Sequence, residues 1–458
     1  MKLNFRISFI VTILTLCFYT EFIYSAQLSP ITLPKKKFVV FELKLKEVSF
    51  SGTKYHVVTA DDGSGDYDAP HWQDNSSPID GDADDPGDRK YAVAFTRNTK
   101  MKVSVKFFIK PPSVFSGITK VKGDGPGNLD FPETDATLSG NELTIANVEC
   151  SNAFVDEIDI FDPMEIAWKV SPDGGNTWFD AGTNKNQCYI TWKDPTTTVY
   201  HTAVHIGCKI ADGMKEPLTD ADVCYKIWDA FTGCNVKRAL LDGTSLYYYK
   251  SFLIEKYTTE ELLRNADGQC SAWARFFIDT MSDQGIDHTN DLIYFEAIET
   301  DGFLIKNWSF DAGTGISGNT DYPYLNIPDP PYKRDTEYKW KFAEVKDQIG
   351  ISGQGPNANP ASLFTNHKMT KFDGKYYDPS YGVTYNTNEE FEDGAIDAYF
   401  IHKLNWPVDE PAVNLDLNGD GDKTDVGVEI EVFLMKKNPP GNFDQNLQEH
   451  VYPFGEYP

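Results

Sequence analysis

Short segments in which apolar and polar residues alternate dominate the chain from Phe38 to about Tyr200. Residues Met101 to Ile109 and Met164 to Val170 show this period of two, which is typical of a strand with one buried face. Residues Ser171 to Gly175 combine Pro, Asp and two Gly, so we expect a hairpin turn after the second of these strands. This half of the chain is therefore predicted to consist mainly of strands.

The regular spacing of strands and turns predicts one or two β-sandwiches of the immunoglobulin-like kind over residues 36–199. Nothing in this region has the pattern of a catalytic motif. The segment from Asp61 to Asp88 is rich in Asp, Gly and Pro and contains no Lys or Arg. We expect it to form a long loop that is partly disordered or partly wrapped around a cation.

In the second half of the chain, apolar residues recur three and four positions apart, which predicts helices. Thr219 is the expected cap of one helix, and Cys224 lies on its apolar stripe, so we interpret this cysteine as part of the core. Thr258 and Glu261 have the spacing of a capping box, which predicts another helix that ends before Gly268.

The helix that follows Gly268 is the most informative element of the sequence. Its apolar stripe places Cys270 in the first turn. Free N–H groups at a helix start favour a nearby anion and lower the pKa of a thiol, which produces a thiolate nucleophile. A buried core cysteine is the alternative interpretation of this position.

An Asp-Gly pair at 373–374 separates two strand-like runs and predicts a two-residue hairpin turn. In that register Met369 faces Asp378, and His367 is its diagonal neighbour on the same face of the sheet. Diagonal neighbours lie roughly 7–8 Å apart at the backbone, within the reach of side chains. We therefore expect a hydrogen bond between His367 and Asp378.

A carboxylate that orients an imidazole, which in turn removes the proton of a thiol, forms a nucleophile, base and orienter arrangement. Cys270, His367 and Asp378 provide these groups. At these residues the chain resembles the transglutaminase-like superfamily, a papain-fold group in which a Gly-x-Cys-x-x-x-Ala motif precedes a strand His and a strand Asp followed by Pro. The resemblance covers about residues 200–382 and includes Gly268, Ala274, Pro379, Gly285 and Ile286.

The resemblance implies acyl transfer. The Cys270 thiolate would attack an amide or ester carbonyl, His367 would take and return the proton, and Asp378 would fix the imidazole. Gln269 agrees with the Gly-Gln-Cys form of true transglutaminases. Together with the Cys270 backbone N–H, Gln269 or a nearby Trp is a candidate donor to the oxyanion.

Three functions are compatible with this triad. The first is cysteine-dependent hydrolysis of protein, peptide or peptidoglycan-like amides, which requires no cofactor. The second is a surface binding or scaffold module with a vestigial triad, and the third is protein cross-linking by transfer to an amine. Ser271, where animal enzymes usually have Trp, and Lys368, where an aromatic residue is common, weaken the case for cross-linking more than the case for the triad.

Composition and charge narrow the possible partners. The chain has 458 residues, of which 40% are hydrophobic and 14% aromatic, so that folded cores are expected and global disorder is excluded. At about 100–200 residues per domain, this length suggests two or three domains. The net charge of −27 repels phosphate backbones, so we expect no nucleic-acid partner.

The start of the chain has the pattern of a signal peptide. Lys2 and Arg6 precede a short apolar run, and small residues lie before Gln27. No later segment has the roughly 20 apolar residues that a membrane span requires. The sequence therefore predicts a secreted or cell-surface protein without a membrane span.

Six cysteines remain after the predicted signal peptide. In an exported chain these would ordinarily form three disulfides. Cys150 and Cys188, which both fall in the strand-rich half, are the pair that we expect to be bonded. A free Cys270 nucleophile requires at least one further unpaired cysteine.

A candidate calcium loop lies near the C-terminal end. Oxygen-bearing residues alternate there, with Gly421 at the sixth place, although Gly427 stands where an EF-hand has Glu. A structural Ca²⁺ in this loop would stabilise a C-terminal hairpin, and a plain acidic turn is the alternative. The candidate ligands are Asp416, Asn418, Asp420, Asp422 and Asp425.

These patterns predict an α+β protein with four parts. They are a signal peptide over residues 1–26, a β-sandwich region over 36–199, a transglutaminase-like papain-fold catalytic domain over 200–405, and a C-terminal β segment with the candidate calcium loop over 406–458.

Overall fold

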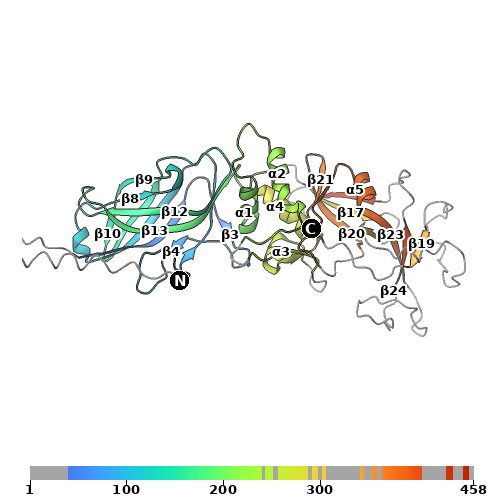
Figure 1. Cartoon of the computed structure of the whole chain (residues 1–458), viewed down its shortest axis with the longest axis horizontal. Helices are drawn as coiled ribbons and strands as arrows, with labels where there is room; N and C mark the ends of the chain where they lie inside the picture. Colours follow the sequence, from blue (N-terminus) through green and yellow to red (C-terminus); the bar gives the residue numbers. More distant parts are fainter. Residues whose placement is uncertain are drawn as a thin grey trace, which may run out of the picture. The chain divides into compact units, whose positions relative to one another are not determined.

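The computed structural model describes residues 40–239, 243–250, 256–286, 291–297, 302–305, 341–344, 353–357, 364–404, 430–436 and 447–452. The expected signal peptide at residues 1–26 and the expected calcium loop from Asp416 to Asp425 lie outside these ranges. Within them the protein is a mixed α and β structure in which strands predominate (Figure 1).

Two sheets form the β-rich N-terminal region, which is described without gaps from residue 40 to residue 199. The first contains, in spatial order, β10 (Thr137–Ser139), β11 (Glu142–Glu149), β7 (Lys102–Lys110), β1 (Glu42–Ser51), β4 (Trp72–Gln73) and β5 (Arg89–Lys90). The second contains β2 (Tyr55–His56), β6 (Val93–Thr96), β13 (Phe179–Thr191), β12 (Asp159–Ser171), β8 (Lys120–Asp124) and β9 (Phe131–Asp135).

The alternation of apolar and polar residues explains how these two sheets pack. Alternate residues of β7 are apolar and fully buried: Val103, Val105, Phe107 and Ile109. The ring centroid of Phe107 lies 6.3 Å from that of Trp168 on β12, so that the two sheets share one apolar core. The hairpin expected after β12 is confirmed by the pairing of Val170 with Phe179 on β13.

The predicted disulfide between Cys150 and Cys188 is wrong, because both thiols are free. Cys188 lies within β13 and pairs with Val93 of β6. Cys150 follows β11 in the other sheet, and its thiol donates a hydrogen bond to the carbonyl oxygen of Asn152 at 2.8 Å. The Cys150 thiol therefore contacts its own loop rather than the facing sheet.

The Asp-rich segment from Asp61 to Asp88 is ordered by its own carboxylates. The side chain of Asp74 accepts hydrogen bonds from the backbone N–H groups of Ser76, Asp80 and Gly81, at 2.8, 3.0 and 2.7 Å. Such bonds from a side chain to nearby amides stabilise turns without regular secondary structure.

Helices follow the β-rich region as the sequence predicted. They are α1 (His201–Ile210), α2 (Asp220–Thr232), α3 (Thr259–Asn265), α4 (Cys270–Ser282) and α5 (Asn388–Ala395). The expected cap at Thr219 is confirmed as a capping box with Asp222, and so is the one formed by Thr258 and Glu261. Cys224 is fully buried on α2, as its place on the apolar stripe indicated.

The remaining strands form two larger sheets and two short pairs. One sheet contains β22 (Val383–Tyr385), β21 (Lys375–Asp378), β20 (Asn366–Phe372), β17 (Asp291–Ala297) and β25 (Leu447–Tyr452). The other contains β18 (Gly302–Ile305), β23 (Ile396–Leu404), β24 (Ile430–Lys436) and β19 (Lys341–Glu344). The short pairs are β14 (Val199–Tyr200) with β3 (Val58–Thr59), and β15 (Tyr247–Tyr248) with β16 (Asp267–Gly268).

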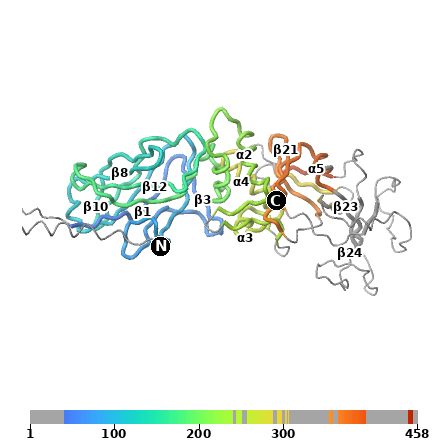
Figure 2. The backbone as a smooth tube through the Cα atoms, viewed as in Figure 1, coloured from blue at the N-terminus to red at the C-terminus, as the bar shows by residue number. Residues whose placement is uncertain are grey.

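Helix α4 packs against the sheet that contains β20 and β21. The helix lies against β20, and the ring centroid of Phe277 on α4 lies 5.3 Å from that of Tyr377 on β21; the backbone trace shows these elements (Figure 2). Thr370 of β20 is fully buried and donates a hydrogen bond from its hydroxyl to the carbonyl oxygen of Ala274 on α4, at 3.0 Å. This bond fixes the sheet against the helix close to the helix start.

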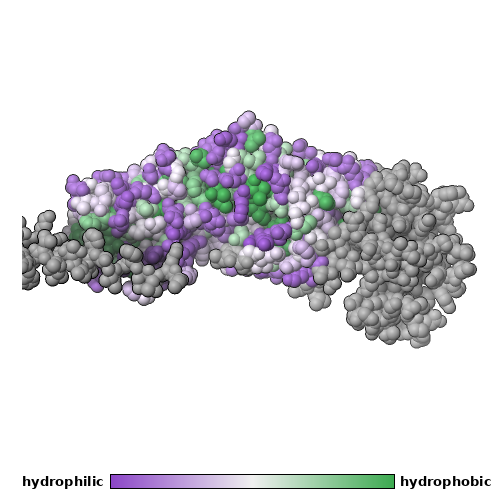
Figure 3. Space-filling model, in the orientation of Figure 1, coloured by the Kyte–Doolittle hydropathy of each residue, from purple (hydrophilic) through white to green (hydrophobic). Residues whose placement is uncertain are grey.

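Polar residues cover most of the face shown in Figure 3, with smaller groups of apolar residues between them. This distribution agrees with the net charge of −27. In the described part of the chain, no helix is both long enough and apolar enough to cross a membrane.

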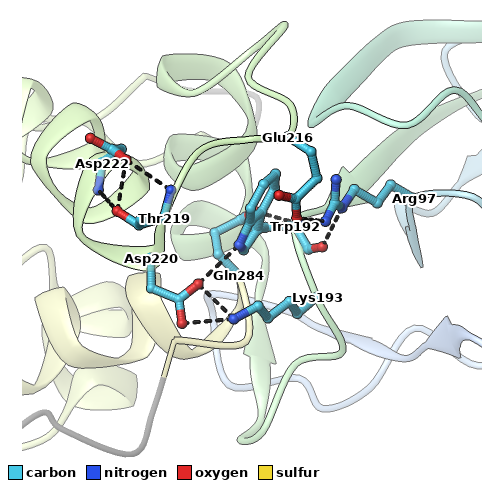
Figure 4. A network of polar contacts seen from close by, with 8 residues as sticks. All are labelled: Arg97, Trp192, Lys193, Glu216, Thr219, Asp220, Asp222 and Gln284. Atoms are coloured by element: carbon cyan, nitrogen blue, oxygen red, sulfur yellow. Dashed lines mark hydrogen bonds and ion pairs between the residues drawn. The ribbon is translucent and has the colours of Figure 1, made fainter.

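Trp192 connects the β-rich region with the helices. Its indole N–H donates to Asp220 at 3.0 Å, and its backbone N–H donates to the side-chain oxygen of Gln284 at 3.0 Å. The Arg97 guanidinium lies 3.7 Å from the centre of the indole ring. Figure 4 shows these contacts together with the ion pair between Lys193 and Asp220.

We predict that Trp192→Ala lowers the free energy of unfolding by about 3–5 kcal/mol, because it leaves a cavity and removes the indole hydrogen bond. Trp192 is 2% exposed. Urea denaturation followed by circular dichroism measures the change. Trp178→Ala is the matched control, since that ring is only partly buried and contacts Lys122. An equal loss in both variants would contradict the role assigned to Trp192.

Candidate active site

The chain before Cys270 is held in an unusual backbone conformation. Helix α3 ends at Ala266, which has a left-handed φ of 54°. Gly268 follows, and a Cβ at this position would lie 2.9 Å from the Cβ of Ala272 and 3.0 Å from Leu262. Only glycine therefore allows the chain to turn so closely into α4.

A buried ion pair anchors the same segment. The Lys256 ammonium lies 2.6 Å from the Asp267 carboxylate, and both side chains are less than a tenth exposed. The backbone N–H of Gln269 donates to the carbonyl oxygen of Lys256 at 3.2 Å. These contacts fix Asp267 and Gln269, which lie on either side of Gly268 just before the cysteine.

Cys270 is the first residue of α4, as predicted, and it is 5% exposed. The side chain of Gln269, the N-cap residue, makes no capping hydrogen bond to the helix. The first N–H groups of a helix have no partner within the helix, and they favour negative charge. A thiolate at Cys270 would lie at this position.

The predicted contact between His367 and Asp378 is confirmed. Pairing of Phe372 with Lys375 across the Asp-Gly turn gives the expected register of β20 and β21. His367 Nε2 lies 2.7 Å from Asp378 Oδ2, with the two side chains 0% and 1% exposed. The carboxylate thus holds the imidazole in one orientation without competition from water.

The other oxygen of Asp378 is also bound. Its Oδ1 accepts a hydrogen bond from the backbone N–H of Ser380 at 3.1 Å. The carbonyl oxygen of Asp378 accepts from the N–H groups of Tyr381 and Gly382, which closes a tight turn after β21. The turn leaves the carboxylate little freedom to rotate.

His367 also interacts electrostatically with Cys270. His367 Nδ1 is buried and has no hydrogen-bond partner among the described residues. Burial lowers the pKa of the imidazole, but Asp378 and then the Cys270 thiol raise it by more, so that the pKa of His367 rises from 6.5 to about 10. An imidazolium is therefore favoured at neutral pH, as in a thiolate–imidazolium pair.

Aromatic rings enclose the imidazole. Phe391 stacks on it with a centroid distance of 6.0 Å and an interplanar angle of 20°. Phe364 and Tyr381 contact it at 6.0 and 5.8 Å. Tyr248 packs edge-on against Tyr381, and burial raises the pKa of both phenols, so that they stay neutral.

Gln269, the candidate oxyanion residue, lies directly before the nucleophile position and is half-buried. Its backbone carbonyl accepts from the N–H of Trp273 at 3.1 Å. The indole N–H of Trp273 instead donates to the carbonyl oxygen of Tyr247 at 3.2 Å. The indole N–H of Trp273 therefore already has an acceptor and is not available to an oxyanion.

Sequence reasoning missed two residues beside Asp378. The composition of the segment from Gly353 to Gly355 is typical of a flexible loop, yet these residues are buried. The Gln354 side chain donates to the carbonyl oxygen of Pro379, and the backbone N–H of Ser380 donates to the Asp378 carboxylate. Two glycines around one Gln were the available indication, because closely spaced glycines often mark a close approach of two backbones.

The described residues contain no group of three or more His, Cys, Asp or Glu side chains arranged to hold a metal ion. Asp416, Asn418, Asp420, Asp422 and Asp425 lie outside the described ranges. The calcium prediction for them stays a prediction.

Comparison with known proteins gives no family assignment. No protein-family model matches the chain, and no curated protein matches it. The interpretation of the site therefore depends on its own geometry.

The raised pKa of His367 predicts a pH-dependent stability. Because the pKa is about 10 in the folded state and 6.5 in the unfolded state, the stabilisation is complete below pH 6.5 and is lost as the pH rises towards 10. His367→Gln should remove this slope, which is at most about 1.4 kcal/mol per pH unit. Urea denaturation at several pH values measures it.

His71→Gln is the matched control. The His71 ring is also buried, but burial lowers its pKa to about 4, so it changes charge below pH 6.5 only. This variant should keep the wild-type slope between pH 6.5 and 10. Equal slopes in the wild type and in His367→Gln would show that His367 is not charged in the folded protein.

Proposed function

We propose that the chain is a cysteine-dependent acyl-transfer enzyme that hydrolyses amide bonds of protein or peptide substrates. The observation that carries the proposal is the fully buried hydrogen bond of 2.7 Å between His367 and Asp378. The Asp378 carboxylate binds one imidazole nitrogen, and the other nitrogen, His367 Nδ1, has no hydrogen-bond partner among the described residues. Both features suit a base that exchanges a proton with Cys270.

In the proposed reaction, the Cys270 thiolate attacks the carbonyl carbon and forms a C–S bond. The carbonyl oxygen becomes an oxyanion, for which the Cys270 backbone N–H and the Gln269 side chain are candidate donors. The tetrahedral intermediate collapses, the C–N bond breaks, and the His367 imidazolium gives its proton to the leaving amine.

Water completes the cycle. Neutral His367 removes a proton from a water molecule, which attacks the thioester, and the C–S bond breaks to release a carboxylic acid and regenerate the thiolate–imidazolium pair. Asp378 keeps the imidazole in the required orientation throughout.

The remaining cysteines support the choice of nucleophile. Burial is the largest cause of a raised pKa at each of the others: Cys150, Cys188, Cys208, Cys224 and Cys234. A buried thiol with a raised pKa is a poor nucleophile at neutral pH.

We also propose that residues 200–382 have the transglutaminase-like fold and that residues 36–199 are an immunoglobulin-like sandwich. The first is supported by a nucleophile helix that packs against an antiparallel sheet with His and Asp on neighbouring strands. The second is supported by the shared core of the two N-terminal sheets. Because residues 1–26 have the pattern of a signal peptide, we propose an exported enzyme.

The proposal predicts selective alkylation of one thiol. At mildly acidic pH, iodoacetamide should label Cys270 well before the other cysteines, since only a thiolate reacts. His367→Ala should slow this labelling by about tenfold or more, because the imidazolium that stabilises the thiolate is gone. Mass spectrometry of the digested protein measures labelling at each cysteine, and the other five thiols serve as internal controls.

If Cys270 reacts no faster than the same thiol in denatured protein, the enzyme proposal fails. When labelling is selective, incubation with a casein-like protein substrate and a labelled primary amine distinguishes the acceptors. New peptide ends without amine incorporation support hydrolysis, whereas amine incorporation would replace hydrolysis by transfer. Cys270→Ala should abolish either product.

A further inference from the structure

Gln354 lies at a place where two backbones come unusually close together. Its neighbours Gly353 and Gly355 have φ values of 54° and 66°. A Cβ at Gly353 would lie 2.6 Å from the Ser380 carbonyl oxygen, and one at Gly355 would lie 2.3 Å from that of Leu246. Both positions therefore exclude a side chain, and Gln354 is the side chain that this segment places in the interior.

The Gln354 side chain uses its whole amide group. It is 0% exposed, and its Nε2 donates to the carbonyl oxygens of Phe231 and Pro379, at 2.8 Å each. Its Oε1 accepts from the backbone N–H of Val236 at 3.4 Å. Two buried carbonyls would lose their partner if this amide were removed, and such a loss is costly in the interior.

On one side, hydrogen bonds connect Gln354 to the Asp378 carboxylate. The Gln354 backbone N–H donates to Ser380 at 2.9 Å, while its side chain binds Pro379. The N–H of Ser380 then donates to Asp378 Oδ1. Gln354 thus holds both residues of the turn that binds the carboxylate oxygen opposite to His367.

On the other side, a hydrogen bond and a strand pairing connect Gln354 to the segment before Cys270. The N–H of Tyr248 donates to the carbonyl oxygen of Gln354 at 3.0 Å. Strand β15, which contains Tyr248, pairs in parallel with β16 at Gly268, directly before Gln269 and Cys270. One residue thereby contacts both the turn that follows Asp378 and the strand that pairs with the segment before the nucleophile.

We infer that Gln354 is a positioning residue that sets the orientation of the Asp378 carboxylate, and through it the orientation of the His367 imidazole. The inference rests on the proposed function of the triad. Without the amide, the Pro379–Ser380 turn loses its support, the Ser380 N–H moves from Asp378, and the carboxylate rotates away from the imidazole. Loss of the Gln354 amide therefore weakens the hydrogen bond between His367 and Asp378 and also lowers the stability of the protein.

The test compares Gln354→Met with Gln284→Met. Gln284 is equally buried, but its side chain bonds Trp192 and Cys208 rather than the Pro379–Ser380 turn. Both substitutions replace a buried amide by an apolar chain of similar length, so both should lower stability. They differ only in their expected effect on His367.

The first readout is the low-field proton resonance of the His367–Asp378 hydrogen bond, assigned by its absence in His367→Ala. We expect it in the wild type and in Gln284→Met, and we expect it to shift or disappear in Gln354→Met. The second readout is the rate of iodoacetamide labelling at Cys270 as a function of pH. In Gln354→Met the rate at mildly acidic pH should fall about tenfold and recover at higher pH, because a misplaced imidazole stabilises the thiolate less.

A folded Gln354→Met protein with wild-type resonance and wild-type pH profile would overturn the inference. The resonance tests the role of Gln354 even if Cys270 proves unreactive in the wild type. An unreactive Cys270 would overturn the proposed function alone. If Gln354→Met does not fold, Gln354→Glu takes its place, since it keeps the shape and regains one donor hydrogen when protonated. Its resonance should recover as the pH is lowered, and a pH-independent wild-type resonance would contradict the inference.

Discussion

The register between β20 and β21 determines the geometry of the whole candidate site. The turn at residues 373–374 is closed by two left-handed residues, with φ values of 48° and 75°. This turn pairs Phe372 with Lys375 and leaves His367 and Asp378 on the same face. A slip of one residue would send one of the two side chains to the opposite face, and the hydrogen bond could not form.

Helix α4 joins this sheet to the rest of the protein. Its first residue is Cys270, its second turn accepts the hydroxyl of Thr370, and Gln284, just beyond its end, binds the backbone of Trp192. The nucleophile, the sheet with the base and the β-rich region are therefore connected through one rigid element.

Local patterns explain which parts were predictable from the sequence. The capping box of Thr258, the place of Cys270 and the Asp-Gly hairpin all depend on residues a few positions apart, so that the sequence contains their causes. Gln354 could not be found in this way, because its partners Phe231 and Pro379 are distant in sequence and are backbone carbonyls, which have no residue signature.

Two further features could not be predicted for a similar reason: the free state of Cys150 and Cys188, and the position of Cys270 relative to His367. Composition suggested a disulfide between Cys150 and Cys188, but whether two cysteines meet depends on which sheet each strand joins and where the thiol points. The His367–Asp378 contact was predictable because one short hairpin contains both residues. Its distance from Cys270 depends on packing of α4 on the sheet, which no local pattern encodes.

The place of β25 has a consequence for biosynthesis. This strand covers the outer edge of β17, and its Glu449 binds Lys371 and Tyr376 of the strands that present His367 and Asp378. Because a ribosome produces the chain from the N-terminus, β17 keeps an open edge until residues 447–452 have emerged. The sheet therefore closes only after its other four strands have been made, and the nascent chain depends on β25 for a protected edge.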